Sequence, residues 1–312
     1  MIVTTMKLYN DRDDVTLTTY LWNDSPEMLN KKSRPAVLIC PGGAYLSCSD
    51  REGEPIALQF AAMGYHAFVL RYSVYGDFSV FEQGIDHMKT DPAKMHPAPM
   101  REIGMAIRQI REHSQEWFVD TEKIAICGFS AGGHNCAMYA TNYHKPVVTE
   151  YLQMDAGDLR PAAVILGYPL TDYVFMKDSL KNTKDPMAKI LFELSAFSFL
   201  GKTTPEEKLL TEISPARNVS EHTPPTFIWA TAADSLVPIE HSVLMSYALA
   251  QCQVPFAIHI FEEGPHGLAT ATQSSAQAKS EINPQAAEWI GLCESWLRKR
   301  FALDLPEKSP WA

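Results

Sequence analysis

The chain has 312 residues, of which 46% are hydrophobic, so it is long enough to bury a large core. Asp and Glu outnumber Lys and Arg by 37 to 27, and the net charge of −10 is unsuited to binding nucleic-acid phosphates. No segment approaches the roughly 18 consecutive apolar residues of a membrane helix. The first residues also lack the basic and apolar regions of a secretory signal. We therefore expect neither nucleic acid nor a membrane as a partner.

The cysteines indicate a reducing environment. None of the six is paired in a CxxC motif, and several lie within expected strands or helices, where a free thiol behaves as a small buried hydrophobe. We therefore expect free thiols, no metal site and a cytoplasmic location. The residues concerned are Cys40, Cys48, Cys127, Cys136, Cys252 and Cys293.

Short apolar stretches along the chain predict β-strands. Val15–Trp22 alternates in polarity and predicts an antiparallel strand. Residues 36–40 form a continuous apolar run between two prolines, which is typical of a strand buried on both faces. Further strands are expected at 66–72, 123–127, 162–166, 226–231 and 256–261.

Helices are expected between these strands. The spacing of Ile103, Ile107 and Ile110 predicts one helix, and Asn283 followed by Pro284 predicts the start of the last one. Strands that alternate with helices predict an α/β protein with a mainly parallel, doubly wound sheet and helices on both faces. We expect residues 1–312 to form a single domain. Other helices are expected at 54–63, 134–140 and 239–250.

Two segments interrupt the alternation. Residues 73–98 have no clear period and contain several glycines and prolines, so they predict a long surface loop. Residues 172–215 are rich in Phe, Leu, Met and Lys and predict a helical cap insertion. In such a sheet the insertion would cover the carboxyl ends of the strands, where ligands bind.

A nucleophile motif lies between an expected strand and an expected helix. Residues 128–132 read Gly-Phe-Ser-Ala-Gly, and the glycines allow the sharp turn that exposes the oxygen of Ser130. As a five-residue pattern it is common, and an ordinary glycine-rich turn is the alternative. Its position at a strand-to-helix turn favours the nucleophile.

A serine nucleophile needs a base and an acid, and both follow later strands. Asp234 comes after strand 226–231 and His266 after strand 256–261, in the chain order Ser, Asp, His. Asp172 is the rival acid, because it also follows an expected strand. His134 lies one helical turn after Ser130, and we expect it to pack rather than to react. His241 and His259 are expected to be structural.

A glycine pair supplies candidate donors for an oxyanion. The loop after strand 36–40 contains Gly42 and Gly43, which let the backbone approach a substrate. The expected donors are the N–H groups of Gly43, Ala44 and Ala131. Pro41 stands where the usual His-Gly-Gly-Gly motif has His, so a simple Gly-Gly turn is the alternative here.

Together these motifs resemble the serine carboxylesterases of the α/β-hydrolase superfamily. The pattern is most similar to the bacterial acetyl esterase and acetylxylan-esterase-like group related to hormone-sensitive lipase. The resemblance covers roughly residues 35–300 and includes Arg51-Glu52-Gly53-Glu54-Pro55 and Ser214-Pro215. It implies that Ser130 is the nucleophile, His266 the base and Asp234 the acid. It also implies that no cofactor is needed.

The resemblance implies a small ester substrate with a short acyl group, above all acetyl, and extends to acetylated sugars. The alternatives are a peptidase or arylformamidase-type amidase with the same three residues, and a non-catalytic binding protein. The oligomeric state, including a homo-oligomer, is left open. Candidate residues of the substrate pocket are Tyr45, Tyr168, Leu236 and Val237, with Phe197 and Phe199 from the insertion.

Overall fold

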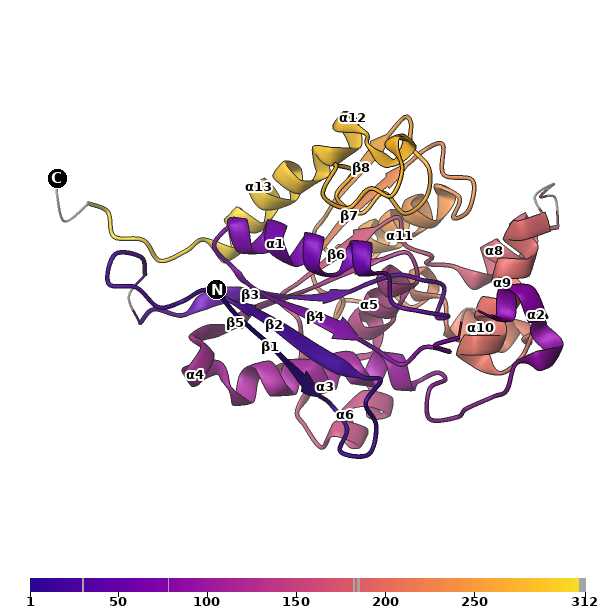
Figure 1. Ribbon diagram of the computed structural model, residues 1–312, viewed down its shortest axis with the longest axis horizontal. Helices are drawn as coiled ribbons and strands as arrows, with labels where there is room; N and C mark the ends of the chain where they lie inside the picture. The colour runs from indigo at the N-terminus through magenta and orange to yellow at the C-terminus, as the bar shows by residue number, and fades with distance from the viewer. Residues whose placement is uncertain (30, 78, 182, 184–185, 309–312) are drawn as a thin grey trace.

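A computed structural model describes residues 1–308 except 30, 78, 182 and 184–185 (Figure 1). Its strands form one sheet in the order β1-β2-β4-β3-β5-β6-β7-β8, in which the β1–β2 and β2–β4 pairs are antiparallel and all the other pairs are parallel. The predicted α/β class and the mainly parallel sheet are therefore confirmed. The strands are β1 (Ile2–Lys7), β2 (Thr16–Leu21), β3 (Arg34–Cys40), β4 (His66–Arg71), β5 (Val119–Phe129), β6 (Ala163–Gly167), β7 (Thr226–Thr231) and β8 (Phe256–Phe261).

Every strand expected from the sequence is present, and β1 is an addition. The side chains of Ile2–Lys7 are mostly exposed, so this segment carries no alternation of buried and exposed residues. It is a strand because its backbone pairs with β2 at the edge of the sheet. β5 begins at Val119, four residues before the expected start at Lys123, and so includes polar residues that the apolar pattern left out.

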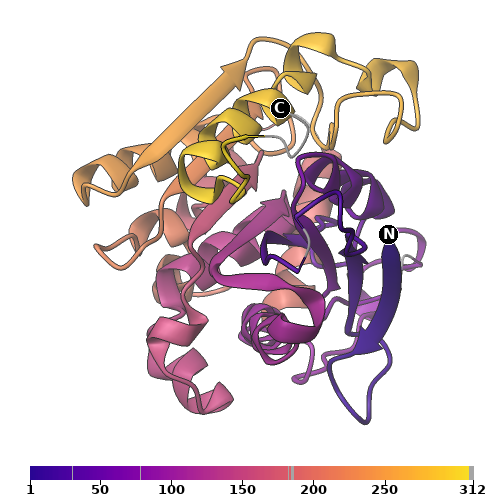
Figure 2. The same ribbon diagram turned by 90° about the vertical axis from the view of Figure 1, so that its left-hand side faces the viewer.

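Alternate residues of the central strands enter two separate cores. In β3, Val37 and Ile39 pack on one face, whereas Leu38 and Cys40 pack on the other. The first face is covered by α1 (Glu54–Ala62), α12 (Pro284–Ala287) and α13 (Trp289–Phe301). The second is covered by α3 (Ala98–Glu112), α5 (Ala131–Asn142) and α11 (Glu240–Gln251). Helices on both faces were predicted and are present (Figures 1 and 2).

Several short helices were not predicted. Elements of three to seven residues contain too few turns for a periodic apolar pattern to identify them. They are α4 (Ser114–Trp117), α6 (Pro146–Leu152), α7 (Ala156–Leu159) and the 3₁₀ helices η1 (Asp50–Glu52), η3 (Pro215–Arg217) and η4 (Lys279–Glu281).

The predicted insertion is helical and lies between β6 and β7. It contains α8 (Tyr173–Ser179), α9 (Pro186–Leu200) and α10 (Glu207–Glu212), while its positions 182 and 184–185 lie outside the described residues. We call residues 172–215 the cap. Residues 73–98, expected to be a loop, contain α2 (Val80–Gln83) and η2 (Ile85–His87), and position 78 is outside the described residues. Val80 and Met88 of this segment pack with Leu194 of α9, at the same end of the sheet as the cap (Figure 1).

Three further expectations concern absences. All six cysteines are free. Within the described part of the chain, no helix is long and apolar enough to cross a membrane. Among the same residues, no group of three or more His, Cys, Asp and Glu side chains is placed to hold a metal ion.

Candidate active site

Ser130 occupies a strained turn between β5 and α5. Its φ of 52° and ψ of −119° are unusual for a residue with a side chain. The flanking glycines are required by close backbone contacts. A Cβ atom at Gly132 would lie 2.0 Å from the carbonyl oxygen of Cys40, and one at Gly128 would lie 2.2 Å from that of Gly132. The turn therefore has the geometry of the predicted nucleophile elbow.

A chain of hydrogen bonds joins Ser130 to His266 and Asp234. His266 Nε2 lies 2.8 Å from Ser130 Oγ, and His266 Nδ1 lies 2.6 Å from Asp234 Oδ2. Asp234 Oδ1 accepts the backbone N–H groups of Leu236 and Val237, each at 2.9 Å. The Asp234 side chain is 1% exposed and that of His266 is 14% exposed. The carboxylate is thus held rigidly and orients an imidazole that solvent can reach.

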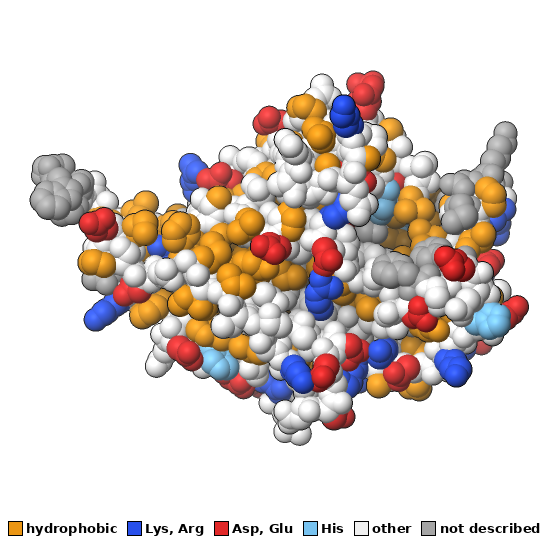
Figure 3. Space-filling model, viewed as in Figure 1, with side chains coloured by type: hydrophobic (Ala, Val, Ile, Leu, Met, Phe, Trp, Pro, Cys, Tyr) orange, Lys and Arg blue, Asp and Glu red, His pale blue; other side chains and the backbone are white. Residues whose placement is uncertain are grey.

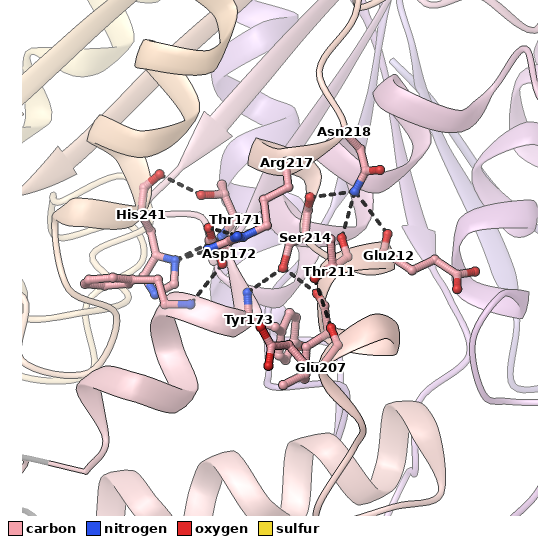
Figure 4. Close-up of polar contacts among 12 residues, drawn as sticks. Thr171, Asp172, Tyr173, Glu207, Thr211, Glu212, Ser214, Arg217, Asn218 and His241 are labelled. Atoms are coloured by element: carbon pink, nitrogen blue, oxygen red, sulfur yellow. Dashed lines mark hydrogen bonds and ion pairs between the residues drawn. The ribbon is translucent and has the colours of Figure 1, made fainter.

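Asp172, the rival acid, is occupied elsewhere. Its Oδ2 accepts from Arg217 Nε at 2.7 Å, and its Oδ1 accepts from the Phe175 N–H at 2.9 Å, which caps α8 (Figure 4). His241 Nδ1 lies 3.2 Å from the backbone nitrogens of both Thr171 and Asp172, so it accepts their N–H groups. Burial lowers the pKa of His241 to about 4. This cluster joins the start of the cap to η3 and α11, and its carboxylate contacts Arg217 rather than His266.

The other two histidines named from the sequence, His134 and His259, contact groups outside the Ser130–His266–Asp234 chain. His134 Nε2 lies 2.7 Å from the carbonyl oxygen of Ile213, so it donates there, and Nδ1 accepts the Tyr45 hydroxyl at 2.6 Å. Burial lowers the pKa of His134 to about 3, which keeps the ring neutral. His259 lies on β8 with its ring against Phe227. Neither residue contacts Ser130 through its side chain.

The loop after β3 places unused N–H groups beside Ser130. A Cβ atom at Gly42 would lie 2.9 Å from Ser130 Cβ, so there is no room for a side chain between the loop and the serine. Gly43 and Ala44 have φ values of 129° and 55°, which turn the chain sharply. No hydrogen bond within the described part of the chain uses the N–H groups of Gly43, Ala44 or Ala131. These three donors are free to bind an oxyanion.

A cavity of about 330 Å³ opens at Ser130 and His266. One part of its wall is apolar and includes Leu191 and Phe192 of the cap helix α9; another part is polar and includes Ser47, Ser49 and Arg51. In the space-filling view, hydrophobic side chains line a hollow beside the cap (Figure 3). The lining also includes Gly43, Ala44, Ala131, Leu170, Tyr173, Met176, Ala188, Ser195, Leu236 and Val237.

Two of the four predicted pocket residues line this cavity and two do not. Leu236 and Val237 do. Tyr45 is 1% exposed and Tyr168 is 3% exposed, and both side chains point into the protein because their hydroxyls bind His134 and Glu52. The prediction that these tyrosines line the pocket is therefore wrong.

The two phenylalanines named from the insertion are also absent from the cavity wall. Phe199 is buried, and its ring stacks on Tyr45 at 4.1 Å between centroids. Phe197 packs in the small core between the cap and residues 73–98. The cap does supply the apolar wall, but through Tyr173, Met176, Leu191 and Phe192. A general excess of apolar residues predicted a cap without indicating which side chains face the substrate.

Sequence reasoning missed the polar wall and the role of Glu52. Ser47, Ser49 and Arg51 follow the glycine loop directly, so their position in the chain was an available signal. Glu52 is buried and accepts two hydrogen bonds, from the Gly42 N–H and the Tyr168 hydroxyl, each at 2.6 Å. A glutamate just before a helix is ordinarily solvated, so nothing local marked this one as buried.

Comparison with known families identifies the chain. The BD-FAE family model matches residues 25–249, which is more than half of the sequence. The chain therefore belongs to the BD-FAE family. This family membership agrees with the resemblance found in the motifs.

Two curated relatives of this BD-FAE-family chain are bacterial enzymes. Endo-1,4-beta-xylanase B of Butyrivibrio fibrisolvens is 34% identical over 82% of the chain. Acetylxylan esterase of Xylanibacter ruminicola is 25% identical over 76% of the chain. The chain spans only 35% and 42% of the length of these relatives, respectively.

A solved structure matches along the whole length. The carboxylesterase Cest-2923 from Lactobacillus plantarum WCFS1 is 28% identical, with a TM-score of 0.77 over 98% of this chain and 100% of that one. The BD-FAE-family chain thus has the predicted α/β-hydrolase fold, and its relatives include ester hydrolases.

Proposed function

We propose that this chain is a serine carboxylesterase that hydrolyses short-chain esters of the acetyl type. The observation that carries the proposal is the hydrogen-bonded chain in which His266 contacts Ser130 Oγ at 2.8 Å and Asp234 at 2.6 Å. The similarity to a carboxylesterase over the whole chain supports it independently.

The proposed mechanism uses the same groups for acylation and for deacylation. Ser130 Oγ attacks the ester carbonyl carbon while His266 Nε2 takes the hydroxyl proton, and Asp234 stabilises the resulting imidazolium. The N–H groups of Gly43, Ala44 and Ala131 bind the oxyanion of the tetrahedral intermediate. The alcohol leaves with the proton from His266. Water then hydrolyses the acyl-enzyme by the same route and releases the acid.

The cavity favours a small ester whose two halves differ in polarity. Its volume of about 330 Å³ is near the lower end of ligand sites, which suits a short acyl group. The apolar wall from the cap suits that acyl group, and the hydroxyls of Ser47 and Ser49 suit a polar alcohol such as a sugar. The acetylxylan esterase relative supports acetylated sugars as the class to test first.

The test is hydrolysis of p-nitrophenyl esters with acyl chains of two to eight carbons, together with acetylated xylo-oligosaccharides. We expect turnover of the acetyl ester and a loss of about a thousandfold or more in kcat for Ser130→Ala. Ser280→Ala, which changes an exposed serine, is the control and should keep full activity.

Two results would contradict the proposal. One is the absence of turnover on every ester, with cleavage only of formyl-amide or dipeptidyl substrates, which would favour the amidase alternative. The other is folded wild-type protein that a fluorophosphonate does not label at Ser130, which would favour a non-catalytic binding protein.

A further inference from the structure

A buried carboxylate lies next to the proposed site but has no part in the mechanism above. Glu52, at the end of η1, is 4% exposed and forms part of the cavity wall close to Ser130. An isolated buried carboxylate is strongly unfavourable unless hydrogen bonds compensate for the lost water. The hydrogen bonds that Glu52 accepts therefore indicate what the carboxylate does.

The first bond holds the oxyanion loop. Glu52 Oε2 accepts the Gly42 N–H at 2.6 Å. Gly42 directly precedes the expected donors Gly43 and Ala44, and it lies so close to Ser130 that an added Cβ atom would be 2.9 Å from Ser130 Cβ. The carboxylate consequently fixes the first residue of the loop whose next two N–H groups remain free for an oxyanion.

The second bond reaches the histidine loop. Glu52 Oε1 accepts the Tyr168 hydroxyl at 2.6 Å, and the Tyr168 oxygen in turn accepts the Ala269 N–H at 2.9 Å. The Tyr168 ring also packs edge-on against the His266 imidazole, with 5.0 Å between centroids. One carboxylate thus connects the segments that follow β3, β6 and β8.

We propose that Glu52 is a positioning residue that holds the Gly42–Ala44 loop and the His266 loop at the correct separation around Ser130. This inference rests on the proposed esterase function. The oxyanion exists only in and near the transition state, so a displaced loop weakens transition-state binding more than substrate binding. Burial raises the pKa of the Glu52 carboxyl above its usual value, and the hydrogen bonds from Tyr168 and Gly42 offset part of this rise.

Glu52→Gln is the first test. Whichever way the amide faces, either the Gly42 N–H or the Tyr168 hydroxyl loses its acceptor. We expect kcat on p-nitrophenyl acetate to fall about 10- to 100-fold, with a change in KM of less than about threefold. A trifluoromethyl ketone, which forms a tetrahedral adduct with the serine, should bind more weakly by a similar factor. Glu54→Gln, the same change at an exposed position two residues later, should have none of these effects.

Tyr168→Phe is the second test, and it keeps the proposal falsifiable if Glu52→Gln does not fold. It removes the hydroxyl but keeps the ring against His266, so we expect a smaller fall in kcat. The double variant should lose less than the product of the two single effects, because both changes break one connection.

The inference is overturned if Glu52→Gln binds the trifluoromethyl ketone like the wild type, or if kcat per titrated active site is unchanged and only stability falls. Those outcomes differ from failure of the proposed function, in which the wild type itself would not turn over esters. A normal Glu52→Gln enzyme beside an inactive Ser130→Ala enzyme would therefore contradict this inference alone.

Discussion

Two aspartates at the ends of neighbouring strands show how residue-level chemistry is decided by partners. Asp234 follows β7 and contacts His266, whereas Asp172 follows β6 and contacts Arg217. Both lie in loops at the same edge of the sheet, and both are almost completely buried. Chain order and local sequence favoured Asp234 as the acid, but only the side-chain contacts show which of the two carboxylates reaches His266.

Replacing each aspartate by asparagine tests which of the two carboxylates supports His266. Asp234→Asn should lower kcat about a thousandfold or more, because an amide neither orients the imidazole correctly nor stabilises its charged form. Asp172→Asn should keep kcat within about twofold, because the amide oxygen can still cap α8 and the lost Arg217 pair lies away from His266. The measurement is kcat on p-nitrophenyl acetate for both variants. A comparable loss in both would mean that Asp172 also serves His266.

At the scale of elements, the cap helix α9 faces the core on one side and the cavity on another. Ala188, Leu191, Phe192 and Ser195 line the cavity at helical spacing. Ile190, one position from Leu191, is 43% exposed on the outer side. The sequence predicted that a helical insertion would cover the site, but α9 is apolar around much of its circumference, so its periodicity did not indicate the inner face.

Shortening a cavity-lining side chain of α9 should change acyl-chain preference. Leu191→Ala removes three carbons from the apolar wall, and each added acyl CH₂ that is buried there gains about 0.8 kcal/mol. We expect the ratio of kcat/KM for hexanoate to that for acetate to rise about tenfold or more. Ile190→Ala makes a similar truncation on the exposed side and should leave the ratio unchanged. An unchanged ratio in Leu191→Ala would show that α9 does not contact the acyl chain.

At the scale of the whole molecule, buried neutral histidines link stability to pH. Burial lowers the pKa of His66, His96 and His241 to about 4 each, and that of His134 to about 3. An unfolded chain has histidines with a pKa near 6.5 and so binds more protons than the folded chain between about pH 6.5 and 4. Their contribution to stability is therefore fully present above pH 6.5 and is lost as the pH falls toward 4.

Urea unfolding at pH 7, 6 and 5 measures this dependence. For each buried histidine, the free energy of unfolding should fall by about 1.4 kcal/mol for every unit by which the pH decreases in that window. Around His241, Asp172 and Asp234 raise the pKa and His266 lowers it, but burial outweighs all three. His241→Asn removes one of these groups and should reduce the slope of unfolding free energy against pH by about 1 kcal/mol per pH unit. The variant should still fold, because the amide oxygen can accept the Thr171 and Asp172 N–H groups. The exposed His87→Asn is the control, and equal slopes in all three proteins would contradict the assignment.

Local patterns were sufficient for most of the elements and for the side chains that we propose to react. The apolar runs predicted the strands because a strand buried on both faces needs continuous apolar residues. The glycines around Ser130 and the aspartate and histidine after β7 and β8 predicted the site because parallel strands end at one edge of a sheet. The exposed edge strand β1 and the short helices lacked such a pattern and were missed.

The sequence by itself determined most of the strands and longer helices along the chain, the mainly parallel sheet, and the three side chains expected to meet where its strands end. Only the tertiary structure decided that Tyr45 and Tyr168 turn inward, that α9 supplies the cavity wall, and that Glu52 joins two loops. The physical reason is distance along the chain. Glu52 and Tyr168 are 116 residues apart, and Ser130 and His266 are 136 apart. A local pattern specifies backbone conformation and burial, whereas packing of distant segments selects the partner of each polar side chain.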